Sequence, residues 1–385
     1  MRIGIDARFL THPQKGGFKT YSENLISALA EVDKDNSYFL YLDRPPDQQT
    51  KLPKQPNFKY RVIPGENPVF GMPWREQIGL PHFAAKNRLD LLHSPCLTAP
   101  LRLKCASIVT IHDMIWFSSR YSVKAPVSLK RKLINWYYYL VPKIAARKSS
   151  LVLTVSQASK DRITRELGIP ADKVFVTYEA ASPIFCQTQD VEEISGIRTR
   201  YNLPADYIMA IGSADPRKNI STLVQAYAQL PANLKTAYQL VIIWTHPLMA
   251  DTLMRQVEDL GLIEYVRFLM RVPDEDLVLL YNGASLFVFP SLEEGFGLPL
   301  LEAMACGTPV VAGNNSSIPE VVGDAALLVQ PNDTRELSET IAKVLSDDNL
   351  KNEITVLSKF FSASLSNFMQ ILSKLLITLK SCKIC

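Results

Sequence analysis

The sequence has little that would mark a membrane-spanning, secreted or disulfide-stabilised protein. No run reaches the roughly 18 uninterrupted apolar residues of a membrane span. The first ten residues, MRIGIDARFL, lack the basic start and apolar stretch of a signal peptide. The six cysteines of this 385-residue chain are too widely and irregularly spaced for a disulfide framework. These absences predict a cytoplasmic protein.

Other absences exclude classes of ligand. The 42 Lys and Arg against 38 Asp and Glu give a net charge of only +4, which does not indicate a nucleic-acid partner. No Gly-x-Gly-x-x-Gly motif is present, so a nicotinamide-dependent dehydrogenase has little support. The five histidines show no metal-ligand spacing, and the single CxxC motif, Cys382–Cys385, lacks a second pair. We expect neither a metal nor a cofactor.

What the sequence does contain is an alternation of short β-branched runs with segments of helical period. This pattern is typical of parallel sheets covered by helices. Seven strand candidates precede position 180 and six follow position 206, with a polar, charged stretch between them. We therefore predict an α/β chain of two Rossmann-like, doubly wound domains, with a ligand cleft between them. The expected boundaries are residues 1–185, residues 186–350 and a tail at residues 351–385.

The strongest chemical signal is the segment PSLEEGFGLPLLEAMACGTPVV, from Pro290 to Val311. A strand is expected to end at Pro290 and a helix to begin near Pro299, since proline is tolerated in the first turn of a helix. Backbone N–H groups of the intervening loop and the positive helix end make an anion site. Glu294 precedes that helix and Glu302 lies about one turn inside it, so both carboxylates can contact one ligand. The loop residues expected at this site are Gly295, Phe296, Gly297 and Leu298.

A second signal follows the first strand of the second half, where Arg217 and Lys218 lie in the segment IGSADPRKNI. When a diphosphate leaves, negative charge grows on its oxygens, and fixed cations stabilise that transition state. Arginine can bind two phosphate oxygens, and lysine acts as a compact point charge. This dipeptide is therefore a candidate phosphate site, although a solvated basic turn has the same composition.

Three further candidates are weaker taken alone. His112 ends a predicted strand in the segment VTIHD, where a locally hydrogen-bonded histidine is the simpler interpretation. Gly16 and Gly17 lie in KGGFK, and glycines allow the backbone to approach an anion closely. Val272 lies in a short loop after another predicted strand.

The spacing of Glu294 and Glu302 around EGFGLP resembles the donor-site signature of glycosyltransferase family 4 (group 1), whose members are retaining enzymes of the GT-B fold. The resemblance implies two Rossmann-like domains that face each other across a cleft. It also implies that Glu294 binds hydroxyls of the donor sugar, that Glu302 binds the ribose, and that Arg217 and Lys218 bind the diphosphate.

The same resemblance assigns the weaker candidates. It implies that His112 lies near the donor sugar and the reaction centre. It implies that the loop at Gly16 and Gly17 closes over the phosphates or the acceptor. The backbone around Val272 would meet the nucleotide base.

The activity implied is hexose transfer from a nucleotide-diphosphate sugar to a hydroxyl of a saccharide or lipid-linked acceptor. Anomeric configuration is retained, no metal is used, and the leaving phosphate helps to deprotonate the acceptor. GDP-mannose is the first choice of donor, and a UDP-sugar remains open. Two alternatives remain: a sugar-nucleotide epimerase or phosphorylase on the same fold, and a relative that binds donor without turnover.

Two segments depart from this description or add to it. From Thr355 onward the Ser-, Lys- and Leu-rich tail loses the family's character, which suggests a frameshift or truncation. The basic run Lys130–Lys132, followed by the aromatic run Trp136–Tyr139, would suit an anionic membrane surface. An ordinary half-exposed helix is the alternative interpretation of that segment.

Overall fold

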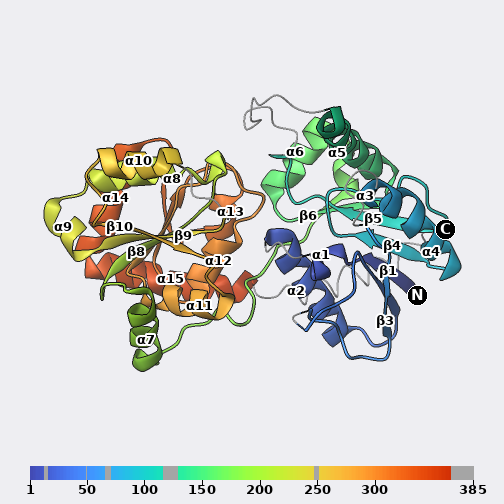
Figure 1. Cartoon of the computed structure of the whole chain (residues 1–385), viewed down its shortest axis with the longest axis horizontal. Helices are drawn as coiled ribbons and strands as arrows, with labels where there is room; N and C mark the ends of the chain where they lie inside the picture. The colour runs from blue at the N-terminus through green and yellow to red at the C-terminus, as the bar shows by residue number, and fades with distance from the viewer. Residues whose placement is uncertain (13–15, 49, 66–70, 116–128, 247–250, 366–385) are drawn as a thin grey trace. The chain divides into compact units, whose positions relative to one another are not determined.

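The structure, a computed structural model of the chain, describes all residues except 13–15, 49, 66–70, 116–128, 247–250 and 366–385 (Figure 1). The chain forms two compact units. Unit 1 is Met1–Glu179, and unit 2 runs from Ala180 to the end of the described residues at Leu365. The CxxC motif and most of the tail lie outside the described residues. The domain boundaries expected from the sequence remain a prediction.

Unit 1 is built on a seven-stranded parallel sheet with the order β3-β2-β1-β4-β5-β6-β7. Strands β1 and β4 are central, and the chain winds outward from them in both directions. Most side chains of β1, β4 and β5 are buried, as expected for parallel strands with both faces covered. The strands are β1 (Arg2–Asp6), β2 (Ser37–Leu42), β3 (Phe58–Val62), β4 (Leu91–Ser94), β5 (Ala106–Thr110), β6 (Leu151–Thr154) and β7 (Val174–Val176).

One helix of unit 1 has an unexpected form. The helical periodicity of Trp74–Lys86 predicts a single helix, but the first full turn of this segment is π-helical. Arg75 in this turn is fully buried, and its guanidinium donates to the carbonyls of Tyr41 (2.7 Å) and Ile63 (3.0 Å). π-helical turns are rare inside helices, and a contact of this kind depends on tertiary structure. The helices are α1 (Arg8–Thr11), α2 (Gly17–Val32), α3 (Gly71–Trp74), η1 (Arg75–Gly79), α4 (Leu80–Lys86), α5 (Leu129–Lys148), α6 (Gln157–Leu167) and η4 (Ala171–Lys173).

Unit 2 is built on a six-stranded parallel sheet with the order β10-β9-β8-β11-β12-β13. This is the Rossmann order, in which the first and fourth strands lie side by side at the centre. The strands are β8 (Tyr207–Gly212), β9 (Gln239–Trp244), β10 (Val266–Met270), β11 (Leu286–Phe289), β12 (Val310–Gly313) and β13 (Leu327–Val329).

Helices cover both faces of the unit 2 sheet, with α8 and α10 on one side and α11 and α12 on the other (Figure 1). Apolar side chains of α8, α10 and α14 join those of the strands in one buried core. The helices are α7 (Val191–Tyr201), η5 (Pro216–Lys218), α8 (Ile220–Ala228), α9 (Ala232–Ala237), α10 (Asp251–Asp259), α11 (Asp274–Gly283), α12 (Leu298–Ala305), α13 (Ile318–Val322), α14 (Thr334–Ser346) and α15 (Asp348–Leu365).

The strand order brings two distant loops together. Strands β8 and β11 pair in parallel register, with Leu286 opposite Ile208 and Phe287 opposite Met209. The loops that follow them therefore leave the same edge of the sheet side by side. Such a point, where the winding of the sheet reverses, is where open α/β sheets bind ligands. Strands β1 and β4 form the corresponding point in unit 1.

The tail begins as part of unit 2. Helix α15 continues without a break past Thr355, where the family pattern was expected to fail. Ile354 is buried in the core of unit 2, and the Ser358 hydroxyl donates to the carbonyl of Ala325 (3.0 Å). Among the described residues, no helix is both long and apolar enough to cross a bilayer.

Candidate active site

The loop after β8 presents the two predicted cations. Asp215 caps the short helix η5 by accepting from the backbone N–H of Arg217 (3.0 Å). Asn219 ends that turn in the left-handed region, at φ +54°, and begins α8. Asparagine tolerates this conformation better than most residues. The turn thus holds Arg217 and Lys218 at the carboxyl edge of the sheet.

The loop after β11 carries the predicted acid. Gly297 has φ +116°, a conformation that a residue with a Cβ rarely adopts, and a Cβ there would lie 3.0 Å from Leu300. The chain can therefore turn sharply into α12, which begins at Leu298 and contains Pro299 in its first turn. Glu294 lies three residues before this turn.

A third loop, between β12 and α13, fixes the conformation of the second. The Ser316 hydroxyl accepts from the backbone N–H of Glu294 (2.9 Å) and donates to its carbonyl (2.7 Å). The Ser317 hydroxyl donates to the carbonyl of Phe296 (2.8 Å). The Asn315 amide donates to the carbonyl of Leu292 (2.7 Å). The backbone around Glu294 is therefore held in place before any ligand binds.

The two motifs that the sequence predicted separately are in direct contact. Lys218 Nζ lies 2.7 Å from Glu294 Oε1, and these side chains are 20% and 12% exposed. The backbone N–H of Leu292 donates to the carbonyl of Arg217 (2.7 Å). The Asn219 amide bridges the carbonyls of Pro290 (3.1 Å) and Pro331 (2.6 Å). Because Lys218 has three N–H donors, it can bind a further anion while it contacts Glu294.

Arg217 is oriented by its neighbours. Its Nε donates to Asp215 Oδ2 (2.9 Å), and its Nη1 donates to the carbonyl of Glu293 (3.3 Å). The Arg217 side chain is 17% exposed, so it does not extend into bulk solvent. The planar donor fork of arginine suits phosphate oxygens in general, and here its Nε and Nη2 are engaged by the Asp215 carboxylate.

Glu302 lies inside α12 and has a shifted titration. Tyr281 of α11 donates its hydroxyl to Glu302 Oε2 (3.1 Å). Burial raises the pKa of Glu302 to about 7. The hydrogen bond from Tyr281 lowers this pKa, and the negative charge of Asp274 raises it by a smaller amount than burial does. The carboxyl is therefore only partly ionised at neutral pH. Gly307, at φ +76°, follows the end of this helix.

Val272 is placed apart from these groups. It follows β10, which is the edge strand of the sheet, whereas the two loops follow the central strands β8 and β11. Its side chain is half-buried. The structure therefore places Val272 at the same edge of the sheet as Lys218, but two strands further out.

In unit 1, His112 lies beyond the end of β5 instead of within the predicted strand. Its Nδ1 is 3.2 Å from Glu179 Oε1, and its Nε2 is 3.2 Å from the carbonyl of Pro95. Burial lowers the pKa of His112, but Glu179, Pro95 and Asp113 together outweigh it and the pKa lies above its usual value. The imidazole is only 11% exposed.

The two predicted glycines lie at the start of α2, where Gly16 is the capping residue and Gly17 begins the helix. The space where a Cβ would sit is empty within 4 Å at both positions. The backbone is thus open to a close approach there. Lys15, which precedes them, lies outside the described residues.

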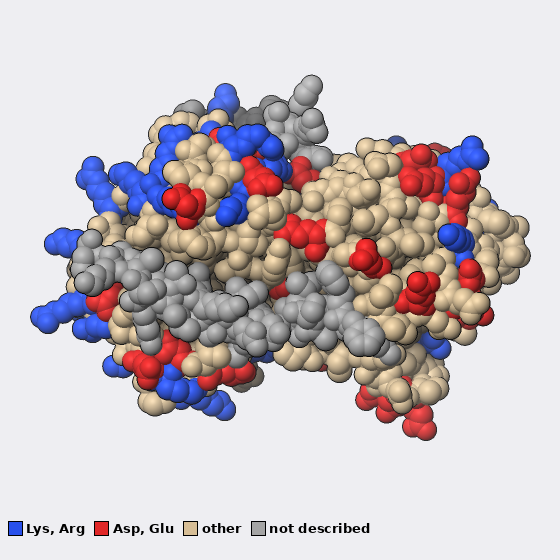
Figure 2. Space-filling model, turned by 180° about the vertical axis from the view of Figure 1, so that it is seen from behind, with Lys and Arg blue, Asp and Glu red and all other residues tan. Residues whose placement is uncertain are grey.

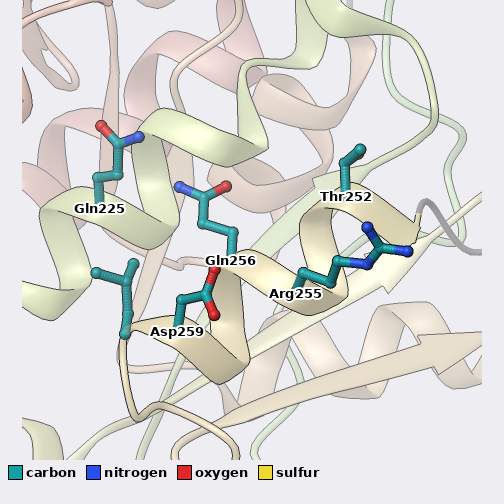
Figure 3. A pocket seen from close by; sticks show the side chains of 6 residues that line it. Gln225, Thr252, Arg255, Gln256 and Asp259 are labelled. Atoms are coloured by element: carbon teal, nitrogen blue, oxygen red, sulfur yellow. The ribbon is translucent and has the colours of Figure 1, made fainter.

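Other features of the described residues do not compete with this site. A hollow of about 440 Å³ lies between α8 and α10, lined by polar side chains that include Gln225, Arg255 and Gln256 (Figure 3). None of the candidate residues lines it. Among the residues described, no three His, Cys, Asp or Glu side chains are arranged to hold a metal ion.

Sequence reasoning missed the residues that hold the site together. Ser316 and Ser317 follow a strand as a serine pair, a recognisable turn signal, but their target at Glu294 could not be read from it. Asn219 could have been suspected as a left-handed turn residue. Nothing near Tyr281 or Glu179 in the sequence indicates the side chain that each contacts.

The chain resembles known proteins over nearly its whole length. Residues 15–181 match the model of Glycosyltransferase Family 4, and residues 197–356 match that of Glycosyl transferases group 1. It is 38% identical to O-antigen chain mannosyltransferase B of Escherichia coli, over 69% of this chain and 68% of that one. It is 33% identical to the serotype-specific mannosyltransferase WbdA of Escherichia coli over 57% of this chain, and it matches only 28% of the length of WbdA.

Solved structures share the architecture. Sucrose-phosphate synthase from Thermosynechococcus elongatus has a TM-score of 0.77 at 20% identity, over 99% of this chain and 100% of that one. WaaG, a glycosyltransferase involved in lipopolysaccharide biosynthesis, has a TM-score of 0.74 at 15% identity, over 97% and 99%. The 38% identity to the mannosyltransferase and the fold shared with these structures both agree with the family that the motif around Glu294 and Glu302 indicates. The chain is therefore a member of glycosyltransferase family 4, group 1, with the GT-B fold.

Proposed function

We propose that this chain transfers mannose from GDP-mannose, with retention of configuration, to a hydroxyl of a saccharide or lipid-linked acceptor in polysaccharide assembly. The observation that carries the proposal is the contact between Lys218 and Glu294, which brings a cation suited to phosphate beside an acid suited to sugar hydroxyls. The choice of mannose is supported by the curated relatives, which are named mannosyltransferases. A UDP-sugar is the alternative donor.

The proposed chemistry follows from the charges. The acceptor oxygen bonds to the anomeric carbon on the face from which the diphosphate leaves, and the bond between that carbon and the phosphate oxygen breaks. The acceptor proton passes to the leaving diphosphate. Arg217, Lys218 and the start of α12 stabilise the charge that develops on that leaving group. Glu294 accepts hydrogen bonds from sugar hydroxyls, and Glu302 accepts them from the ribose.

A thermal-shift panel tests the donor. A ligand present at 100 times its Kd stabilises the folded state by about 2.7 kcal/mol. We expect GDP and GDP-mannose to raise the melting temperature by several degrees and UDP, UDP-glucose and NADH to do so less. If no nucleotide changes the melting temperature, the proposed donor site is wrong.

Incubation with the donor alone separates the alternative functions, because only an epimerase would isomerise the donor sugar. A relative without turnover would bind donor but transfer sugar to no acceptor.

We further propose that unit 1 contacts an anionic membrane, where a lipid-linked acceptor would lie. Residues 1–179 hold 27 Lys and Arg against 15 Asp and Glu, whereas residues 180–366 hold 12 against 23. Figure 2 shows the basic side chains more densely over unit 1. On α5, Leu133 (60%), Trp136 (63%) and Tyr139 (50%) are exposed, and Lys143 Nζ lies 3.7 Å from the centre of the Tyr139 ring. Basic and aromatic side chains together favour the membrane interface.

Vesicle co-sedimentation tests this contact. We expect the double change Leu133→Ser and Trp136→Ser to reduce binding to phosphatidylglycerol vesicles about tenfold, because apolar area and charge both contribute to interfacial binding. Ile263→Ser, which removes an apolar side chain of unit 2 that is 66% exposed, is the matched control. Equal binding by both variants, or binding that does not weaken as salt is added, would rule out this surface.

A further inference from the structure

The surroundings of His112 in unit 1 determine the protonation state of its ring. The carbonyl of Pro95 can only accept a hydrogen bond, so Nε2 must donate to it. An ionised Glu179 carboxylate also only accepts, so Nδ1 must donate as well. A neutral imidazole carries one N–H and can satisfy only one of these two acceptors. The pair of contacts, each 3.2 Å, therefore matches an imidazolium.

Other groups pack against the ring of His112 or favour its charged form. The rings of Phe18 and Tyr21, both from α2, lie at right angles to the imidazole at centroid distances of 5.0 and 4.5 Å. The Ser159 hydroxyl of α6 donates to the backbone carbonyl of His112 (2.9 Å). Asp113 favours the cation as a nearby negative charge.

A second histidine near His112, His93, has a lowered pKa instead of a raised one. His93 of β4 bonds through Nε2 to the Thr110 hydroxyl (2.8 Å), and the Tyr21 hydroxyl lies 3.5 Å from the same Thr110 oxygen. Burial lowers the pKa of His93 to about 4, and the charge of His112 lowers it too. Burial raises the pKa of Tyr21 to about 12, so Tyr21 is neutral. Divergent environments of neighbouring titratable groups indicate divided roles.

We propose that Glu179 is a positioning residue that keeps His112 as an imidazolium, so that His112 acts in sugar transfer through its charge and not by accepting the proton of the acceptor. Both ring nitrogens are used within unit 1, which leaves neither lone pair for a substrate proton. Glu179 is also the last residue of unit 1 before the chain enters unit 2. The contribution of this charge to transfer rests on the proposed function, whereas the charge state itself does not.

Nitrogen-resolved NMR of the imidazole rings tests the charge state directly. We expect both nitrogens of His112 to carry protons at pH 7 in the wild-type chain, with the signals assigned by their loss in His112→Asn. In Glu179→Gln we expect the pKa of His112 to fall by about one to two units, since one carboxylate charge has been removed. Glu166→Gln, which removes a carboxylate of unit 1 from its pair with Arg162 on the surface of α6, should leave the titration unchanged.

Activity provides a second readout that a purely structural role would not change. Wild-type kcat should not fall as pH rises from 6 to 8 through loss of the imidazolium, whereas in Glu179→Gln it should fall about tenfold over that range. A wild-type ring with one unprotonated nitrogen at pH 7, or a titration unchanged in Glu179→Gln, would overturn the proposal. Because the NMR measurement needs no substrate, a chain inactive on every donor would refute the proposed function without affecting this test.

Discussion

Lys218→Met is expected to reduce kcat by roughly two to three orders of magnitude, while the chain still folds. Removal of one preorganised electrostatic donor from a transition state typically costs about 10²–10³ in kcat. Lys218 is the cation that ends the η5 turn and contacts Glu294. Under the proposed function, its loss removes positive charge beside the leaving diphosphate, so kcat should fall more than the affinity for donor.

Two comparisons show whether the effect of Lys218→Met is local. Lys343→Met removes an exposed lysine of α14 and should leave kcat and the melting temperature unchanged. Lys218→Met also breaks the ion pair with Glu294, which should destabilise the folded chain only modestly. A partly exposed ion pair contributes about 1 kcal/mol or less to the free energy of unfolding. The assignment fails if Lys218→Met retains wild-type kcat. A large drop in the melting temperature of Lys218→Met would also count against the assignment, because unfolding would then explain the loss of activity.

The second large effect concerns pH and the donor. Because burial raises the pKa of Glu302 to about 7, we expect donor affinity to weaken as pH falls from 8 to 6, since a protonated carboxyl accepts fewer hydrogen bonds from the ribose. Glu302→Gln should bind donor about 10-fold to 100-fold more weakly at pH 8, as expected for loss of a charged hydrogen-bond partner. The residual affinity should no longer depend on pH through this range.

Isothermal titration of GDP at several pH values measures this effect. Tyr281→Phe removes a hydrogen bond that lowers the pKa of Glu302, so it should move the pH dependence to higher pH. Glu339→Gln, at an exposed site of α14, should leave it unchanged. Donor affinity that is constant from pH 6 to 8 in the wild-type chain would show that Glu302 does not bind the ribose as an ionised acid.

The same group links pH to stability, with a definite sign. The carboxyl has a higher pKa in the folded chain than in the unfolded chain, so the folded state binds the proton more tightly. Its contribution to stability is therefore complete below the unfolded value of 4.5 and is lost as pH rises through about 7. The loss is about 3 kcal/mol at most. Glu302→Gln should accordingly be more stable than wild type at pH 8, which is the trade-off expected of a functional acid.

The fold class could be predicted because it depends on local periodicity. Thirteen strand candidates were expected, and the structure has seven parallel strands in unit 1 and six in unit 2. Errors occurred where tertiary contacts override local preference. Arg75 in the π-helical turn donates to the carbonyls of Tyr41 in β2 and of Ile63 just after β3. Strand β5 ends at Thr110, and His112 beyond it contacts Glu179 and Pro95.

The sequence by itself determined the two Rossmann-like sheets, the glycine-bearing turn into α12, and the identity of the charges at Arg217, Lys218, Glu294 and Glu302. These follow from residue type and short spacing, which act through backbone conformation and helix ends over a few residues. Only the tertiary structure decided which charges meet. The pairing of β8 with β11 brings Lys218 into contact with Glu294, 76 positions away in the chain. The fold of unit 1 brings Glu179 into contact with His112, 67 positions away. Such contacts depend on strand order, which no local pattern encodes.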